Sequence, residues 1–478
     1  MPRHRFLPAY ARRISAASAL ALVFCAAPAA RAQAAGPYHA SPDGRYFVDG
    51  QGAPFFVHGE SAWSAVVNLS DADTLTYLDD CQRRGFNALM VNVLEHKFAA
   101  KAPANLSGVL PFSGVAFQSA PNAAYMDHVR WFVQAAAQRG IVVFANPAYL
   151  GFNGGDEGWQ QELSAASASS AQAWGSYVGT SLAGSSNLVW HMFGDFNPPS
   201  HGQTNAVHTG IVATSPTAAL FSHHFARGVS SFEDREAWLG WDYVYPPPVG
   251  YMHVETLAGY NATPVIPQIL GEGYYENDPQ APTTEVIRRQ AWGALTSGAS
   301  GHFYGNRHIW GFGNGFEKVD WKSALADPGR QQMAYVKAFF TARSWWRLRP
   351  DQSSSLVTAG RGAQASAGYV TAALASDRSW GVAYLPSGAG PITVNRSLLS
   401  GAIQASWFNP RNGSYTQIGS LPNTGNQKFT APDANDWVLV LDRGTNNPVP
   451  AVPRARHLML LMLATTSCML WTKRRRSR

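Results

Sequence analysis

The feature that most constrains the fold is a repeated change in the spacing of apolar residues between about Gly36 and Arg349. Short apolar runs that suit buried strands alternate with stretches in which apolar residues recur at helical spacing. The strand candidates are Phe55–Val57, Ala88–Leu94, Ile141–Ala145, Leu188–Phe193, Leu220–His224, Asp242–Tyr245, Val265–Leu270 and His302–Tyr304. Strands and helices in alternation predict a mostly parallel sheet that is covered by helices.

Several of the intervening helices carry recognisable start and stop signals, because serine caps helix N-termini well and glycine accepts the left-handed conformation that ends a helix. The predicted helices run from the cap at Ser70 to Gly85, from Ala123 to Arg139 before Gly140, and from Thr284 to Thr296 near Gly298. Eight strands with helices between them favour a (β/α)₈ TIM barrel over residues 36–349. The alternative is an open doubly wound sheet, but the chain has neither a G-x-G-x-x-G fingerprint after a strand nor a P-loop.

The pattern changes at about Pro350, after which only short strands and turns follow. Trp380–Leu385, Ala405–Asn409 and Trp437–Leu441 alternate apolar with other residues, and turn-rich pieces join them. This predicts a small β-sandwich domain over residues 350–442. It has few ionisable groups that could form an active site, so we expect it to pack on the barrel or to bind a ligand.

The two ends of the chain are predicted to be addressing segments that do not belong to the fold. Residues 1–35 combine a basic start, an apolar stretch from Ala17 to Phe24 and small residues at Ala32-Gln33-Ala34, as a secretory signal peptide does. Residues 443–478 contain an apolar run from Leu458 to Trp471 before a basic cluster. That run is shorter than the roughly 20 residues that span a bilayer comfortably. We therefore expect an exported protein with a transient membrane tether.

The tail resembles the PEP-CTERM sorting signal of bacterial exported proteins, which joins a proline-containing motif, an apolar segment and an Arg-rich end. The matching residues are Pro448-Val449-Pro450, the apolar run and Lys473-Arg474-Arg475-Arg476. Val449 stands where that motif carries its central Glu.

Setting the two ends aside reverses the net charge. Of the 37 Lys and Arg residues, five lie in residues 1–35 and seven in residues 446–478, which leaves 25 against 30 Asp and Glu. A nucleic-acid partner calls for a basic patch, so we expect none. Only Cys81 remains in the core of the chain, and it is predicted to be a buried structural thiol.

Two carboxylates directly follow apolar runs, at the positions where a barrel places its chemistry. Asp195 ends the run from Asn187, and Glu272 ends the run from Pro264; each follows a Gly. By the strand count they end strands four and seven and can aim at one bond. Glycoside hydrolysis needs such a pair, about 5–5.5 Å apart in retaining enzymes and roughly 6.5–9.5 Å apart in inverting ones. We predict Asp195 and Glu272 as the catalytic residues.

The sequence resembles the apiosidase-like glycoside hydrolases of family 140, whose members carry a C-terminal β domain named for collagen binding. The segments that carry this resemblance are Pro54 to Trp63, Asn187 to Pro198, Gly271 to Glu276, Gly298 to Gly305, Trp345 to Pro350 and Asp436 to Asp442. The resemblance implies a retaining mechanism with Asp195 as general acid/base and Glu272 as nucleophile. The acid should then have a raised pKa, while hydrogen bonds keep the nucleophile ionised.

An oligosaccharide or polysaccharide is the expected substrate, bound near the strand ends. The predicted substrate-binding residues are His58, Glu60, Trp63, Glu95, Asn153, His224, Tyr275, Glu276, Tyr304 and Trp310. Trp and Tyr faces suit the apolar faces of sugar rings. Adjacent histidines such as His223 and His224 point to opposite faces of a strand, and no H-E-x-x-H occurs. We therefore predict no catalytic metal and no cofactor.

Two departures from the family touch substrate choice. Its first-strand motif usually reads Gly-Asp-Thr-Ala-Trp, whereas Glu60 and Ser61 stand here, and Pro246-Pro247-Pro248 replaces residues that are usually polar. Two other functions stay open. One is a non-catalytic cell-surface protein that binds carbohydrate or matrix, which the tether suggests. The other is a protease or esterase on the same barrel, although the chain lacks a G-x-S-x-G elbow.

Overall fold

The structure is a computed structural model that describes residues 36–443 except 216–219, 230–231, 233–234, 248–250 and 282. The predicted signal peptide (1–35) and the predicted tail after Arg443 lie outside these residues, and so does Pro248. Among the helices that are described, none has both the length and the apolar character needed to cross a bilayer.

The first region forms a sheet of eight parallel strands that curls into a nearly closed, TIM-like barrel, with β8 and β9 as the two end strands of the sheet. Its strands are β4 (Val57–Ser61), β5 (Ala88–Asn92), β6 (Val142–Asn146), β7 (Leu188–Met192), β8 (Phe221–His223), β9 (Asp242–Val244), β10 (Gln268–Leu270) and β11 (Gly301–Tyr304). Neighbours pair in sequence order, and β11 pairs with β4. Between β8 and β9 the backbone amides of Gly240 and Trp241 donate to Phe221. The predicted barrel is confirmed.

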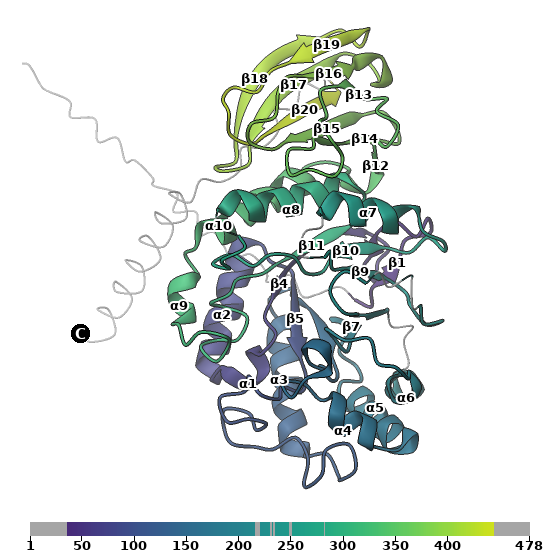
Figure 1. Ribbon diagram of the computed structural model, residues 1–478, viewed down its shortest axis with the longest axis vertical. Coiled ribbons are helices and arrows are strands. Elements are labelled where there is room, and N and C mark those ends of the chain that lie inside the picture. The colour runs from purple at the N-terminus through teal and green to yellow at the C-terminus, as the bar shows by residue number, and fades with distance from the viewer. Residues whose placement is uncertain are drawn as a thin grey trace, which may run out of the picture. The chain divides into compact units, whose positions relative to one another are not determined.

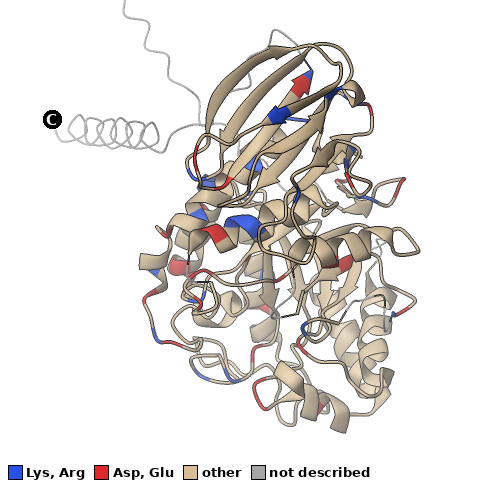
Figure 2. Cartoon of the chain, turned by 45° about the horizontal axis from the view of Figure 1, so that its top comes forward, with Lys and Arg blue, Asp and Glu red and all other residues tan. Residues whose placement is uncertain are grey.

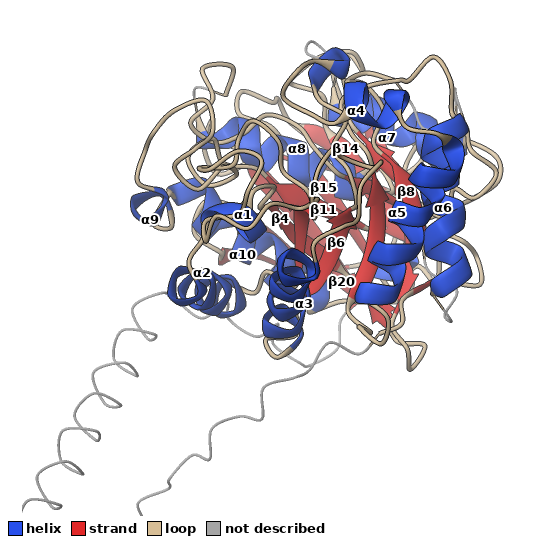
Figure 3. Cartoon of the chain, turned by 90° about the horizontal axis from the view of Figure 1, so that it is seen from below, coloured by secondary structure: helices blue, strands red, loops and turns tan. Residues whose placement is uncertain are grey.

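Helices surround these strands, as Figure 3 shows from below with the strands in red. They are α1 (Ala65–Asn68), α2 (Asp71–Arg84), α3 (Ala123–Ala137), α4 (Gln160–Ala165), α5 (Ala168–Ser181), α6 (Gly202–Thr214), α7 (Met252–Asn261), α8 (Thr284–Thr296), α9 (Trp321–Ala324) and α10 (Pro328–Thr341), with 3₁₀ turns η1 (Phe152–Gly154) and η2 (Trp345–Arg347). The Ser70 hydroxyl caps α2 by accepting from the Asp73 amide, and left-handed Gly85 ends it. Both end signals of α2 act as predicted.

All eight barrel strands differ from their predicted bounds by at least one residue, and at their starts the first and the seventh differ most. Phe55 belongs to a separate three-stranded antiparallel sheet of β1 (His39–Ala40), β2 (Phe47–Val48) and β3 (Pro54–Phe55), and the first barrel strand begins at Val57. The seventh strand starts at Gln268 rather than Val265. Pro264 and Pro267 lack an amide hydrogen, so that segment cannot donate evenly to a ladder.

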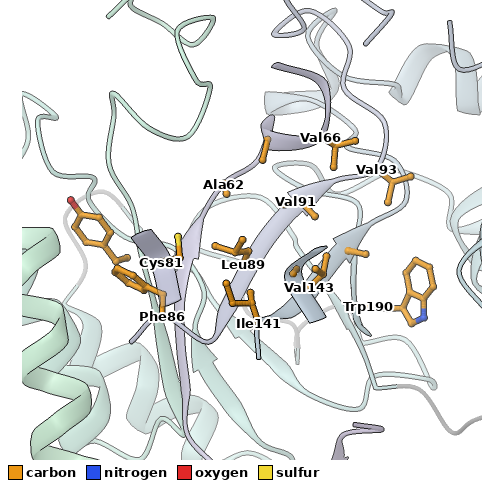
Figure 4. Packing of buried hydrophobic residues seen from close by; sticks show 14 of the residues in the cluster. Ala62, Val66, Cys81, Phe86, Leu89, Val91, Val93, Ile141, Val143 and Trp190 are labelled. Carbon is orange, nitrogen blue, oxygen red and sulfur yellow. The ribbon is translucent and has the colours of Figure 1, made fainter. Parts of the chain in front are cut away.

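The small N-terminal sheet closes one end of the barrel. Phe47 packs edge-on against Phe144 and Trp241, and all three belong to one buried cluster with residues at the starts of the barrel strands. The opposite end, where the strands finish, stays available for a cleft. On the outer face of the strands, Leu89, Val91 and Val143 pack in the layer between sheet and helices (Figure 4).

The second region is a β-sandwich, as predicted. A six-stranded antiparallel sheet runs in the order β12-β14-β15-β20-β17-β18, and a second sheet is β13-β16-β19. The strands are β12 (Leu348–Pro350), β13 (Val357–Ala359), β14 (Thr371–Ala375), β15 (Trp380–Leu385), β16 (Ile392–Asn395), β17 (Ile403–Asn409), β18 (Ser414–Leu421), β19 (Asn426–Phe429) and β20 (Trp437–Arg443), with the turn η3 (Arg396–Leu398). One core cluster contains side chains of both sheets.

The inner strands of the larger sheet, β14, β15, β20 and β17, are buried on both faces, because the other side of the sheet packs on the barrel. Along β20, Leu439 and Leu441 join the sandwich core, while Val438 and Val440 join the main barrel core. The helices α8 and α10 provide the barrel side of this contact, and Figure 1 shows α8 against β14 and β15. Packing on the barrel is therefore one role of the β domain.

Two buried ion pairs hold this contact. Arg288 of α8 donates to both carboxylate oxygens of Asp436 at 2.7 Å, and Arg343 pairs with Asp442 in the same way at 2.9 Å. Elsewhere, Figure 2 shows basic and acidic residues interspersed over the coloured part of the chain.

Candidate active site

A cleft of about 430 Å³ opens where the barrel strands end, a volume typical of small-molecule sites. It is lined by Trp63, Asn92, Glu95, Phe98, Tyr149, Phe152, Glu157, Asp195, His224, Arg227, Tyr245, Glu272, Gly273, Tyr275, Asp278, Arg307, Trp310 and Phe316. Both predicted catalytic carboxylates are in it, as are five of the ten predicted substrate-binding residues.

An unusual backbone turn after β7 positions Asp195. Phe193 and Asp195 have positive φ angles of 68° and 55°, a conformation that side chains rarely adopt outside functional sites. The amide of Asn146 donates to the Phe193 carbonyl, and the Asn146 side-chain oxygen accepts from the Phe193 amide. Gly194 is required between them, because a Cβ there would lie 2.9 Å from the Tyr149 ring. The glycine before Asp195 is therefore needed because the backbone packs closely against the Tyr149 ring.

Glu272 follows β10 directly after Gly271, and close packing requires this glycine as it requires Gly194. A Cβ on Gly271 would lie 1.9 Å from the Tyr243 ring, so only glycine lets the strand end beside that tyrosine. Tyr243 of β9 then donates its hydroxyl to Glu272 at 3.1 Å. The neighbouring strand therefore fixes the direction of the carboxylate.

The two carboxylates and His224 form a compact group. One oxygen from each carboxylate and one ring nitrogen of His224 all lie within 4.8 Å of one another. The Nε2 atom of His224 is 3.6 Å from an oxygen of Asp195 and 3.6 Å from an oxygen of Glu272. The carboxylates are 16% and 13% exposed, whereas His224 is buried beneath them. A ligand in the cleft can therefore touch both acids.

Aromatic hydroxyls complete the group. Tyr149 donates to Asp195 at 3.0 Å, and the Nε1 of Trp63 donates to the Tyr275 hydroxyl at 2.8 Å. Trp63 also stacks on His224, with ring centroids 5.9 Å apart. Aromatic side chains therefore surround the two acids in the cleft.

Electrostatics favour a shared proton on the acid pair. Burial raises the pKa of Asp195, and the hydrogen bond from Tyr149 offsets only part of this. Burial also raises the pKa of Glu272, and the neighbouring Asp195 raises it further. We expected Glu272 to stay ionised through hydrogen bonds; Tyr275 and Tyr243 do lower its pKa, but burial and Asp195 outweigh them. The two groups titrate as a coupled pair.

His224 remains neutral beside this pair, because burial lowers its pKa to about 3. Its ring nitrogens have no hydrogen-bond partner within the described residues. Asp195, His224 and Glu272 are close enough together to contact one cation. The absence of a catalytic metal therefore stays a prediction from the sequence.

Five predicted substrate-binding residues lie in the cleft wall: Trp63, Glu95, His224, Tyr275 and Trp310. Glu95 is fully buried and accepts from Ser64 and Asn92, and burial raises its pKa. Trp310 contacts Phe98 edge-on at 4.9 Å. These placements agree with the expectation that they contact substrate, which stays a prediction.

The structure corrects the prediction for His58 and Glu60. Both lie on β4, two residues apart, so their side chains share one face of the strand. That face is the outer face of the barrel. His58 contacts His302 at 3.0 Å and stacks on Phe86. Glu60 forms a buried bidentate ion pair with Arg330 of α10 at 2.7 and 2.9 Å. Neither side chain reaches the cleft.

Glu276 and Tyr304 also need correction. Glu276 accepts from the backbone amides of Gly329 and Arg330, so it caps the start of α10. Tyr304 donates to Glu276 from the outer face of β11. The side chain of Asn153 is exposed and does not line the cleft. Its backbone amide donates to the Asp195 carbonyl at 3.0 Å.

The sequence reasoning missed Tyr149, Tyr243, Tyr245 and Arg227. Tyr243 and Tyr245 lie at alternate positions of the predicted strand Asp242–Tyr245. Period-two spacing could therefore have placed both side chains on the strand face that Glu272 shares. Arg227 has no such signal. Its guanidinium lies 5.5 Å from the Tyr245 ring only because the chain folds back after β8.

Comparisons with known proteins agree with this architecture. A family model described as "Apiosidase-like, catalytic domain" matches residues 41–347, and one described as "Putative collagen-binding domain of a collagenase" matches residues 350–442. None of the curated proteins that were compared matches the chain.

Two solved structures are similar over most of their length. One, described as "Glycoside hydrolase", is 23% identical, has a TM-score of 0.76 and covers 87% of this chain and 98% of its own. The other, a glycoside hydrolase family 5 structure from Bacteroides vulgatus, is 23% identical with a TM-score of 0.75, and covers 87% of this chain and 97% of its own. At this identity the likeness shows a shared fold.

Proposed function

The chain belongs to the apiosidase-like family of glycoside hydrolases, and on that premise we propose that it cleaves a plant or bacterial polysaccharide with retention of configuration. Asp195 is the general acid/base and Glu272 the nucleophile. The carrying observation is that one oxygen of Asp195 lies within 4.8 Å of one oxygen of Glu272. This supports direct attack by a carboxylate, since an inverting enzyme separates its carboxyl groups by roughly 6.5–9.5 Å to admit a water.

In the first step Asp195 donates its proton to the glycosidic oxygen while a Glu272 oxygen attacks the anomeric carbon. The carbon–oxygen bond to the leaving group breaks, and a covalent glycosyl–Glu272 ester forms. In the second step Asp195 removes a proton from water, the water oxygen attacks the same carbon, and Glu272 leaves as a carboxylate. The two inversions give net retention.

The mechanism starts from the state in which Asp195 and Glu272 together hold one proton. Because burial disfavours two charges at this site, one proton on the pair is the stable form over a range of pH. Arg227 acts to lower the pKa of both groups, which helps the second acid to ionise. A substrate oxygen beside Asp195 would then draw the shared proton to the acid that must donate it.

The walls of the cleft suit a sugar. Trp63, Trp310, Phe98 and Phe316 offer ring faces and edges, while the partly exposed Arg227, Asp278 and Arg307 offer hydrogen-bonding groups. Apolar walls with a few convergent polar groups are the usual arrangement in small-molecule sites. The mixture supports binding of individual sugar rings by stacking combined with hydroxyl recognition.

The test is hydrolysis of a panel of plant and bacterial polysaccharides by the full chain, beside Asp195→Ala and Glu272→Ala. Release of sugar by the wild type that collapses in both variants supports the proposal. The first-formed anomer, followed by NMR, decides the stereochemistry. Product with the opposite anomeric configuration would overturn the retaining mechanism but keep the two-carboxylate chemistry.

A second candidate function is non-catalytic binding of carbohydrate or matrix at the cell surface. The match of residues 350–442 to a domain named for collagen binding favours it. In the same experiment, this function predicts that wild type and both variants bind a glycan or collagen equally well without turnover.

We also propose export, on the support of the signal-like residues 1–35 and the tail after Arg443. Fractionation of the producing cells, with mass spectrometry of both chain ends, tests this. An intact N-terminus on cytoplasmic protein would contradict export, and an intact C-terminus on exported protein would contradict removal of the tail.

A further inference from the structure

A second cavity, of about 270 Å³, lies where the β domain meets the barrel, and we call it the junction cavity. Its barrel side is formed by the start of α7, one face of α8 and the loop after β10; its other side is formed by β14, β15 and the loop before β14 (Figure 1). The residues that line it are Tyr251, Met252, His253, Tyr274, Val286, Arg289, Gln290, Gly293, Ser366, Ala367, Tyr369, Thr371 and Tyr384. Both domains therefore build it.

Aromatic rings dominate one wall. Tyr251 stacks on His253 with centroids 5.8 Å apart, and His253 stacks on Tyr369 at 5.0 Å. The Arg361 guanidinium lies 4.8 Å from the centre of the Tyr369 ring. Tyr251 and His253 belong to the barrel, and Tyr369 belongs to the β domain. Stacking turns the faces of His253 and Tyr369 toward each other, so a ligand in the cavity meets the edges of these rings. Aromatic ring edges are electropositive and can contact the hydroxyl oxygens of a sugar.

Hydrogen-bonding groups stand beside these rings without a protein partner. Among the described residues, the Tyr251 hydroxyl, the Tyr369 hydroxyl and the Arg289 guanidinium make no hydrogen bond, and Arg289 has no ion pair. All three side chains are partly exposed, so water can solvate these groups in the free protein and a ligand can reach them. The cavity therefore combines aromatic side chains with available donors, as ligand sites do.

The cavity is one residue away from the cleft along the chain. Tyr274 lines the junction cavity, whereas Gly273 and Tyr275 on either side line the cleft. Gln290 of α8 fixes this segment, because its side chain accepts from the Tyr274 amide at 3.0 Å and donates to the Tyr274 carbonyl at 2.8 Å. On the cleft side, Arg227 lies 5.3 Å from the Tyr274 ring.

We propose that the junction cavity is a second carbohydrate-binding site, which holds one or two sugar rings of a glycan outside the catalytic cleft. Its volume lies just below the range of about 300–1,000 Å³ of small-molecule sites, which suits a short stretch of a glycan. The choice of a glycan as ligand rests on the proposed function. The site raises the affinity for a polymer that reaches both pockets, because the second contact is then intramolecular.

The binding test uses the full chain with Asp195→Ala and Glu272→Ala, so that no probe is consumed. Cellobiose, xylobiose, mannobiose and digalacturonate are titrated at millimolar concentration by saturation-transfer NMR. We expect at least one to bind, and Tyr369→Ala to weaken that binding about tenfold, because the cavity loses one aromatic wall. Tyr369→Phe keeps the ring and should retain most of the affinity. Arg289→Ala should weaken it, while Tyr177→Ala, a half-buried tyrosine on α5, is the matched control.

Two outcomes would overturn the proposal. One is that none of the probes binds. The other is that binding is lost with Trp63→Ala in the cleft and unchanged with Tyr369→Ala. Loss of binding in Tyr369→Ala with an unchanged melting temperature excludes a folding defect as the cause.

Kinetics of the active enzyme separate this proposal from the proposed function. We expect Tyr369→Ala to raise KM severalfold for the polysaccharide that the wild type hydrolyses, with kcat and the kinetics on a disaccharide fragment unchanged. An equal KM for the polymer in both proteins would count against the second site and leave the catalytic proposal intact. Sugar binding that depends on Tyr369, with no hydrolysis of any substrate, would instead support the second site and count against the catalytic proposal.

Discussion

One group of acids lies outside the barrel strands and another lies at the barrel mouth, and the two groups differ in their partners. Outside the strands, Glu60 of β4 and Asp80 of α2 meet the fully buried guanidinium of Arg330, which belongs to α10. Inside the mouth, Asp195 and Glu272 have tyrosine hydroxyls and a neutral histidine as neighbours, and among the described residues no Lys or Arg is within ion-pair distance of them. The first arrangement holds helices to the sheet, and the second holds reactive groups.

The pKa directions follow from this difference. Although burial acts to raise the pKa of Asp80, the guanidinium groups of Arg330 and Arg84 lower it. Burial raises the pKa of Asp195 and Glu272, and the charge of Arg227, which acts to lower both pKa values, offsets this only in part. A carboxylate at a strand end is therefore not by itself a sign of catalysis; the sign is burial without a cationic partner.

The largest expected effect separates activity from stability. Glu272→Gln should lower kcat by about 10⁴-fold or more, because the covalent step loses its nucleophile. Glu60→Gln should leave kcat of the folded protein within about threefold, since it lies on the other side of the sheet. Steady-state kinetics on the substrate found in the panel check both values. A comparable loss of kcat in folded Glu60→Gln would break the comparison.

The second effect is on stability. Arg330→Met leaves Glu60 and Asp80 buried without their shared cation, and we expect it to lower the free energy of unfolding by about 3–5 kcal/mol. Denaturant unfolding followed by circular dichroism measures this. Adding Glu60→Leu to Arg330→Met removes one stranded charge and should recover part of the loss. No recovery would mean that the arginine acts mainly through packing.

The third effect has the opposite sign and depends on pH. Because the folded protein raises the pKa of Glu272 above its unfolded value of about 4.3, this group contributes stability below that value and loses it as pH rises through the folded pKa. Glu272→Gln should therefore be more stable than wild type by about 0.5–2 kcal/mol near pH 8 and equal to it near pH 4. Melting temperatures at the two pH values test this, and a destabilised variant at pH 8 contradicts it.

Asp80 gives the matched control for that pH dependence. Its folded pKa is lowered, so its contribution is present above the unfolded value of about 3.9 and is lost as pH falls through the folded pKa. Asp80→Asn should accordingly be less stable than wild type at neutral pH, with the difference shrinking in acid.

The smallest effect is expected at an exposed pair. Lys97 and Asp156 lie 3.2 Å apart, with side chains 55% and 79% exposed. Lys97→Ala should change the free energy of unfolding by less than about 0.5 kcal/mol, because solvent screens such a pair. A larger change in denaturant unfolding would show that burial is a poor guide to which pairs matter in this chain.

Much of the architecture could be predicted from local patterns. The Ser70 cap, the glycine at position 85 and the apolar runs before Asp195 and Glu272 each act over a few residues. The first and seventh barrel strands were misplaced by two or three residues at their starts, where a small extra sheet and two prolines changed the pairing. Strand ends depend on neighbouring strands, which the local pattern does not contain.

The site was predicted less completely than the fold. Asp195, Glu272, Trp63, His224 and Tyr275 were placed in the cleft because each follows a strand. Glu60, Glu276 and Tyr304 met the same criterion and lie elsewhere. A shift of one residue along a strand reverses the face of the side chain, and proximity to a strand end cannot resolve one residue.

The sequence by itself determined the barrel, the β-sandwich and the two Gly-carboxylate motifs, because apolar spacing and glycine requirements are local properties of the chain. Only the tertiary structure decided which acids are paired with cations. Arg330 lies 270 residues from Glu60, and Tyr243 lies 29 residues from Glu272. Charge state and reactivity depend on such distant neighbours, since burial and Coulomb interactions act through space rather than along the chain.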